Sequence, residues 1–113
     1  MKKIDNNIQD HVCSDEVIAL LSSRGADIHL LNYRNGFVSH NVAMQWIWLN
    51  FGILLLPDYF YYDGMYFGYK WVSSNGKYGE IWKLKDTEEP SGCDNIKDAT
   101  EFALLTTLKD LLP

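Results

Sequence analysis

The residues best suited to metal binding or covalent catalysis lie far apart in this chain of 113 residues. The histidines, His11, His29 and His40, belong to no zinc-binding motif. Cys13 and Cys93 each precede a predicted helix, a placement that activates the thiol in some enzymes. Inert thiols near helix starts are more common, and the chain has neither a nucleophile elbow nor a glycine-rich phosphate loop. The sequence therefore indicates no metal and no cofactor, and we do not predict an enzyme.

A second group of residues has the chemistry of a binding surface. Tyr59, Tyr61, Tyr66, Lys70 and Lys83 fall on one face of the aromatic strands that we expect from residue 58 onward. Tyrosine gives a large contact area at a low cost in side-chain entropy, and binding surfaces use it for that reason. Either a helix covers this face and the tyrosines are core-edge residues, or the face is open and binds a protein partner.

Charge and hydropathy narrow the classes of partner. The formal net charge is −5 and the ten basic residues are scattered, whereas phosphate binding requires clustered lysine and arginine. The longest apolar stretch, residues 42–56, is shorter than the roughly 20 residues of a membrane-spanning helix. The N-terminus lacks the apolar segment of a secretory signal, and two cysteines without one are typical of the reducing cytosol. We expect a cytoplasmic protein that contacts neither nucleic acid nor membrane.

The first half of the chain reads as helices and one hairpin. Residues 1–13 are polar and are expected to form a flexible tail before a single domain over residues 14–113. A helix is expected after Ser14, and a hairpin that turns at Asn35–Gly36 should follow it.

The apolar stretch 42–56 should divide at Gly52 into an amphipathic helix and a buried strand. Ser39 or Asn41 is the expected cap of that helix. Because the stretch is interrupted in this way, we interpret it as a core segment of the domain.

From residue 58 onward, apolar and polar residues alternate with a period of two, which is typical of a half-buried sheet. Asp63–Gly64 and Asn75–Gly76 are expected to form two-residue turns, and counting from them gives the cross-strand pairs. These pairs are Phe60 with Phe67, Tyr61 with Tyr66, Tyr69 with Trp82, and Lys70 with Ile81. The core face then carries Phe60, Phe67, Tyr69, Trp71, Trp82 and Leu84. The opposite face carries Tyr59, Tyr61, Tyr66, Lys70, Ile81 and Lys83.

A final helix, capped by Asp94 or Asn95, completes an α+β fold. We expect an antiparallel twisted sheet of four or five strands with three helices, in the order α-β-β-α-β-β-β-α, and the helices mainly on one face. The alternative is a three-layer α/β/α sandwich with the final helix on the opposite face.

Four segments, EVIALLSSRGAD, NYRNGF, VAMQWIWLNFGILL and IKDATEFALLTTLKDLL, follow one another in a distinctive order. In this order the chain resembles a family of small uncharacterised proteins encoded by Bacteroidetes and their phages or mobile elements. The resemblance covers roughly residues 14–112, and Trp46 and the Gly52–Ile53 exit carry it best. Because the family has no established activity, the resemblance implies a fold and a genomic setting but no catalytic residues.

These features together favour a small cytosolic accessory protein of phage or mobile-element origin that binds a protein partner or forms a homo-oligomer. An immunity-type protein is one form, because small acidic domains neutralise basic effectors well. The alternative function is that of a small hydrolase or transferase, with Cys93 or a carboxylate in a cleft beside the sheet.

Overall fold

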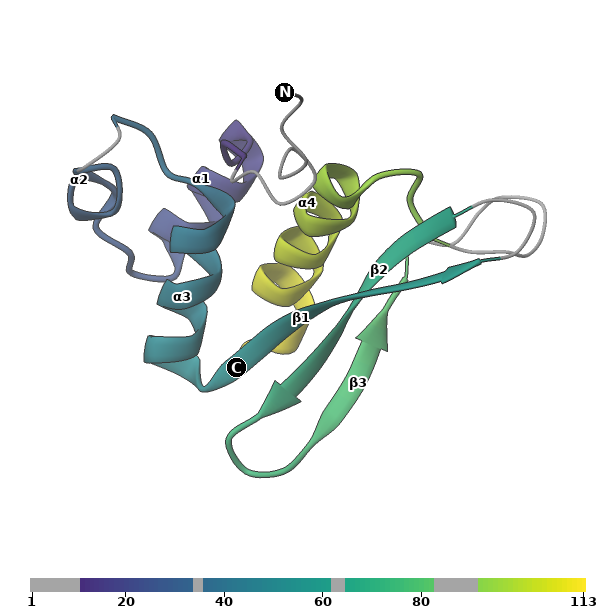
Figure 1. Cartoon of the computed structure of the whole chain (residues 1–113). Helices are drawn as coiled ribbons and strands as arrows, with labels where there is room; N and C mark the ends of the chain where they lie inside the picture. The colour runs from purple at the N-terminus through teal and green to yellow at the C-terminus, as the bar shows by residue number, and fades with distance from the viewer. Residues whose placement is uncertain (1–10, 34–35, 62–64, 83–91) are drawn as a thin grey trace, which may run out of the picture.

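A computed structural model describes residues 11–33, 36–61, 65–82 and 92–113, except for the side chain of Phe60. Helices pack against one side of a small sheet, and the chain passes from the helices into the sheet and back (Figure 1). The elements are α1 (Asp15–Ser23), α2 (Ile28–Leu31), α3 (His40–Phe51), β1 (Ile53–Tyr61), β2 (Met65–Ser73), β3 (Tyr78–Ile81), α4 (Ile96–Thr106) and the π-helical turn η2 (Thr107–Leu111). The predicted α+β class is confirmed.

The long helices begin and end where local sequence signals place them. Ser14, Ser39 and Asn95 each accept a hydrogen bond from the backbone N–H three residues further on, at the starts of α1, α3 and α4. Gly52 ends α3 in the left-handed conformation, with φ of 70°, and directs the chain into β1. The predicted division of the apolar stretch at this glycine is confirmed.

The described residues on either side of the predicted Asn35–Gly36 turn do not form a hairpin, so that prediction is wrong. Ile28–Leu31 forms α2, which starts at Asp27, because the Asp27 carboxylate accepts the N–H of the second helical residue. The first and last residues of α2 share one side of the helical turn and pack against the core. The second expected strand is reduced to a single bridge between Ser39 and Val12.

That bridge also shortens the predicted N-terminal tail. The backbone N–H of Cys13 donates to the carbonyl of Val38 at 2.9 Å, and the N–H of His40 donates to the carbonyl of His11 at 2.7 Å. The chain is therefore held from His11 onward, whereas residues 1–10 lie outside the described residues.

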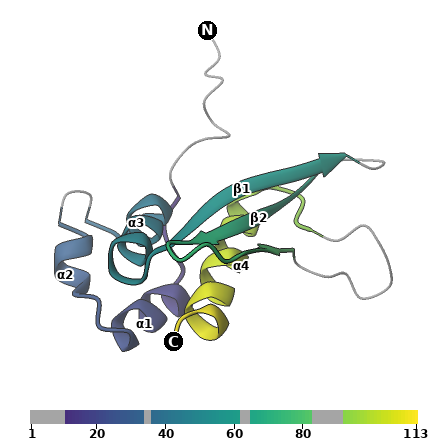
Figure 2. The same ribbon diagram turned by 90° about the horizontal axis from the view of Figure 1, so that it is seen from below.

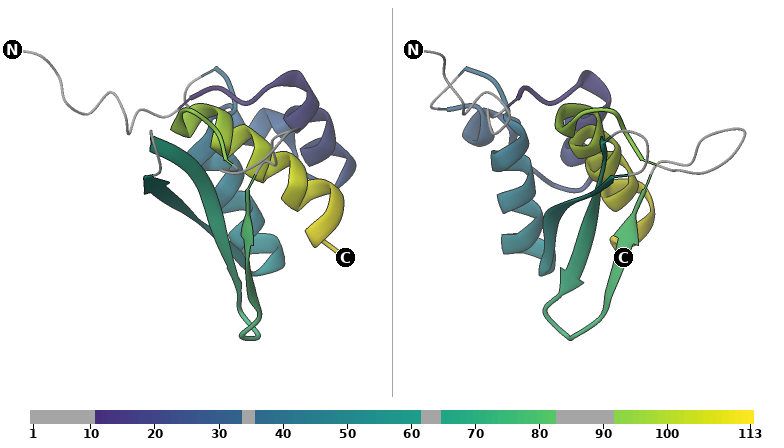
Figure 3. Two further views of the ribbon diagram at one scale, coloured as in Figure 1. Left: turned by 90° about the vertical axis from the view of Figure 1, so that its right-hand side faces the viewer. Right: turned by 45° about the vertical axis from the view of Figure 1, so that its right-hand side comes forward.

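The described part of the sheet has three antiparallel strands, in the order β1-β2-β3, rather than the four or five expected. The two strands of the absent hairpin account for the difference. Figures 2 and 3 show the described helices on one side of the sheet, as predicted. The three-layer alternative is not present in this part of the chain.

The register of both hairpins differs by one residue from the prediction. The second loop has three residues, 74–76, because Gly76 takes a left-handed conformation with φ of 94°, and Ser73 donates its N–H to the Lys77 carbonyl at 2.8 Å. The Asp63–Gly64 turn lies outside the described residues, but the pairing on either side of it shows the same shift. The observed pairs are Tyr59–Phe67, Phe60–Tyr66, Tyr61–Met65, Tyr69–Ile81 and Lys70–Glu80.

This register defines an inner face of the sheet, toward the helices, and an outer face. The inner face includes Ile53, Leu55, Tyr59, Tyr61, Met65, Phe67, Tyr69, Trp71 and Ile81. The outer face includes Leu54, Leu56, Asp58, Tyr66, Lys70, Val72, Tyr78, Glu80 and Trp82. Phe67, Tyr69 and Trp71 are therefore on the predicted face, whereas Trp82 and Ile81 have exchanged faces. The predicted burial of Phe60 concerns a side chain outside the described residues.

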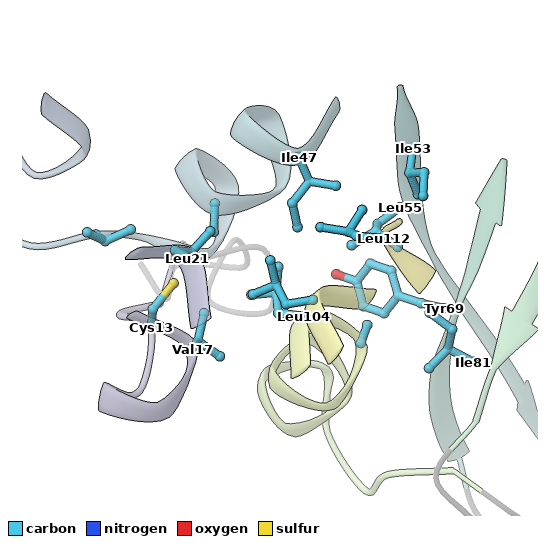
Figure 4. Close-up of a cluster of buried hydrophobic side chains, with 14 of the residues drawn as sticks. Cys13, Val17, Leu21, Ile47, Ile53, Leu55, Tyr69, Ile81, Leu104 and Leu112 are labelled. Atoms are coloured by element: carbon cyan, nitrogen blue, oxygen red, sulfur yellow. The ribbon is translucent and has the colours of Figure 1, made fainter. Parts of the chain in front are cut away.

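The core lies between the inner face and the helices, as Figure 4 shows. Leu21, Ile47 and Leu104, from α1, α3 and α4, are among its largest fully buried side chains. From the sheet, Tyr69 is only 3% exposed and its hydroxyl donates to Thr100 Oγ1 at 2.8 Å. Burial raises the pKa of the Tyr69 phenol from its ordinary value of 10.0, and the hydrogen bond to Thr100 offsets part of that rise.

Tyr69 is therefore expected to set an alkaline limit to stability. Because its pKa is raised in the folded protein, the group has no effect below about pH 10, and the free energy of unfolding falls as the pH rises through the folded-state pKa. Tyr69→Phe should lower stability by about 1 kcal/mol at neutral pH through the lost hydrogen bond, but should reduce the decline above about pH 10. Urea unfolding across this pH range measures both effects. An equally steep decline in the variant would contradict the assignment.

Candidate protein-binding surface

Three tyrosines gather at the free end of the β1–β2 hairpin. Tyr59 and Tyr61 lie at the end of β1 on the inner face, and Tyr66 lies near the start of β2 on the outer face. The hairpin end therefore presents tyrosine on both of its sides, where the prediction placed all three on one.

The helices cover only part of the inner face. Leu55 and Tyr69 are buried, whereas further along the hairpin Tyr59 is 64% exposed and Tyr61 is 75% exposed. Met65, which pairs with Tyr61, is exposed as well. In Figure 1 the paired strands run past α4 toward the right of the view. The two tyrosines are thus open for contact, although they lie on the face that is buried nearer the helices.

Backbone contacts hold the hairpin end in place. Phe67 and Cys93 exchange two hydrogen bonds, at 2.8 and 2.9 Å, which attach the segment before α4 to β2. On the other strand, the Asp58 carboxylate accepts the N–H of Tyr59 at 2.9 Å. The tyrosines therefore project from a paired backbone, and less conformational entropy is lost when they bind.

The free edge of β1 is protected against pairing with another strand. Phe67 uses both its backbone groups toward Cys93, so Tyr59, which pairs with it, directs its own N–H and carbonyl away from β2. Asp58 already occupies that N–H, and Pro57, further along the same edge, has none. Strand addition at β1 is thus disfavoured, and side chains rather than the strand edge are available for contacts.

The two predicted lysines do not join the tyrosines. Lys70 lies in the middle of β2 on the outer face, where its Nζ is 3.8 Å from the Asp58 carboxylate and its pairing partner is Glu80. This partly exposed ion pair contributes little to stability. Lys83 lies outside the described residues.

The structure also forms a polar cluster that sequence patterns did not indicate. His40, whose side chain is 4% exposed, donates from Nε2 to Oε2 of Glu101 at 2.8 Å. The same carboxylate oxygen accepts the N–H of Ser14 at 2.9 Å. The His11 ring meets the His40 ring edge-on, with centroids 5.9 Å apart. The cluster joins the N-terminal segment to α3 and α4, and this role is structural.

Both cysteines are buried and neither is in a disulfide. The thiol of Cys13 donates to the Ser39 carbonyl at 3.5 Å, and Cys93 packs beside β2 through its backbone pairing with Phe67. The alternative of a nucleophilic Cys93 gains no support, since its side chain is not accessible to a substrate. Among the described residues, no three histidine, cysteine or acidic side chains are grouped as a metal site would require.

Within the described ranges, no helix combines the length and the apolar character needed to cross a membrane. No protein-family model matches the chain, and no curated protein or solved structure is significantly similar to it. The phage or mobile-element setting therefore stays a prediction.

Proposed function

We propose that this protein is a small accessory protein that acts by binding another protein, and that the free end of the β1–β2 hairpin makes the contact. The observation that carries the proposal is the exposure of Tyr59 and Tyr61 on a sheet face whose remaining large residues are covered. Residues two apart on a strand point the same way, so the two rings form one surface.

The chemistry of the hairpin end suits a protein interface. Tyr59, Tyr61, Tyr66 and Met65 carry no charge, and the cores of interfaces are enriched in aromatic residues and methionine and depleted of charge. Tyrosine is also among the residues that contribute most to binding energy. We infer that these rings fill apolar pockets on the partner.

An immunity-type role is the form that the charge supports best. A net charge of −5 attracts a basic effector and accelerates its association, and the hairpin tyrosines then supply the short-range contacts. A cytoplasmic location and a gene carried by a phage or mobile element belong to the same proposal. The effector would then be encoded beside this gene.

Photo-crosslinking in cells of the source organism tests the proposal. We expect benzoylphenylalanine at Tyr61 to trap a discrete partner, seen as a species heavier than the 13.1 kDa chain. The matched control is the same replacement at Tyr33, which is also highly exposed but follows α2 at the opposite end of the molecule (Figure 1). The absence of a trapped protein at Tyr61, or the same proteins trapped at both positions, would contradict the proposal.

A further inference from the structure

The outer face of the sheet carries an apolar cluster that no described helix covers. Leu54, Val72 and Tyr78 are neighbours across the three strands, and Leu56 lies beside Leu54 on the same face. All four side chains are exposed. Isolated exposed apolar residues are common, but a contiguous group on one sheet face indicates an interaction site.

Alternating charges adjoin this cluster. Asp58, Lys70 and Glu80 lie on β1, β2 and β3, so that one lysine stands between two acidic residues. Only a small part of the net charge of −5 is therefore on this face. Two copies of the chain would repel each other over most of their surface, but least where these faces meet.

The described helices lie on the inner side of the sheet, and the remaining segments are poor candidates to cover the outer side. Residues 1–10 and 83–91, the longest segments outside the described ranges, are mainly polar. They do not have the apolar residues that burial of this cluster requires.

We infer that a second copy of this chain covers the outer face. A twofold axis parallel to the strands and between β2 and β3 brings equivalent positions of β2 and β3 into contact. Val72 then packs against Tyr78 of the second copy, and Lys70 meets Glu80 of the second copy. Because the axis repeats both contacts, one face satisfies itself in both shape and charge. This surface is separate from the hairpin end.

The size of the face sets the strength of the dimer. β1 and β2 are nine residues long, and strand rise and spacing then give a face of about 30 by 14 Å, or about 400 Å² per copy. Two copies bury about 800–1,000 Å² in total, at the lower end for specific association. The dimer should therefore dissociate with a constant between about 10 μM and 1 mM.

Sedimentation equilibrium over about 5 μM to 1 mM protein spans this range of dissociation constants and tests the inference. We expect the mass to rise from 13.1 kDa toward twice that value as the concentration increases. Leu56→Glu places a charge in the cluster and should raise the dissociation constant at least about tenfold. Leu49→Glu, at an exposed leucine of α3, is the matched control and should dimerise as the parent does. Tyr78→Ser removes a different exposed member of the cluster and should also weaken the dimer.

A single-chain mass at about 1 mM, above the expected range of dissociation constants, would overturn the inference. Unchanged dimerisation of folded Leu56→Glu or Tyr78→Ser, with folding checked by circular dichroism, would overturn it too. Tyr61→Ser should leave the dimer intact, because Tyr61 lies on the inner face. Continued crosslinking at Tyr61 in a monomeric protein would therefore overturn the dimer and leave the proposed function standing.

Discussion

Leu104→Ala is expected to lower the free energy of unfolding by about 3–5 kcal/mol, the largest effect of any single substitution considered for this fold. Leu104 is fully buried on α4, where that helix meets the other helices and the inner face of the sheet (Figure 4). Removing its terminal carbons leaves a cavity that rigid neighbours such as Ile47 cannot fill without moving.

Equilibrium unfolding in urea measures this effect. Leu49→Ala on α3 is the matched control, because the same atoms are removed from a side chain that is 71% exposed. We expect the control to change stability by less than about 0.5 kcal/mol. A loss in Leu104→Ala as small as that in the control would contradict the placement of α4 in the core.

Glu101→Ala is expected to lower stability by about 1–3 kcal/mol. The Glu101 carboxylate accepts hydrogen bonds from the buried His40 imidazole and from the backbone N–H of Ser14. Without it, both donors lose this acceptor in a place where water reaches them poorly. The segment that starts at His11 should loosen as well, and hydrogen exchange at Cys13 would then be faster.

Glu101→Gln is the matched variant, because its amide oxygen can still accept one of these hydrogen bonds. We expect it to lower stability by about 1 kcal/mol and to retain slow exchange at Cys13. Equal losses of stability in the alanine and glutamine variants would show that the hydrogen bonds to Glu101 do not hold the N-terminal segment.

Local signals predicted the helices well because the interactions that fix helix ends are local. Ser14, Ser39 and Asn95 cap their own helices, and Gly52 takes the left-handed conformation that ends α3. The short helix α2 was mistaken for a strand because four residues contain too few turns to separate the two periodicities.

The strand register could not be predicted because the sequence around Asn75–Gly76 fits both a two-residue and a three-residue loop. Contacts across the sheet favour the observed register. A Cβ at Gly79 would lie 2.6 Å from Trp71 Nε1, and a Cβ at Gly68 would lie 2.4 Å from the Trp82 ring. Each indole therefore lies across a glycine of a neighbouring strand, as the isolated Gly68 had suggested.

The candidate surface was only partly predictable. Tyr59, Tyr61 and Tyr66 are conspicuous in the sequence, but their division between two faces follows from the register. Trp46 was expected to be buried and is half-buried, with its ring edge-on to that of Phe51. The pair of His40 and Glu101 joins residues 61 positions apart, and no local pattern indicates such a contact.

The dissociation constant of the complex formed through Tyr61 tests the central claim most directly. Tyr59→Ser combined with Tyr61→Ser should raise it at least about 100-fold, since each exposed ring is expected to contribute about 2 kcal/mol or more to binding. Tyr33→Ser, at a tyrosine 82% exposed on the other end of the molecule, should change it less than about threefold. A constant for the double variant within about threefold of the parent value would contradict the claim that the hairpin end is the binding surface.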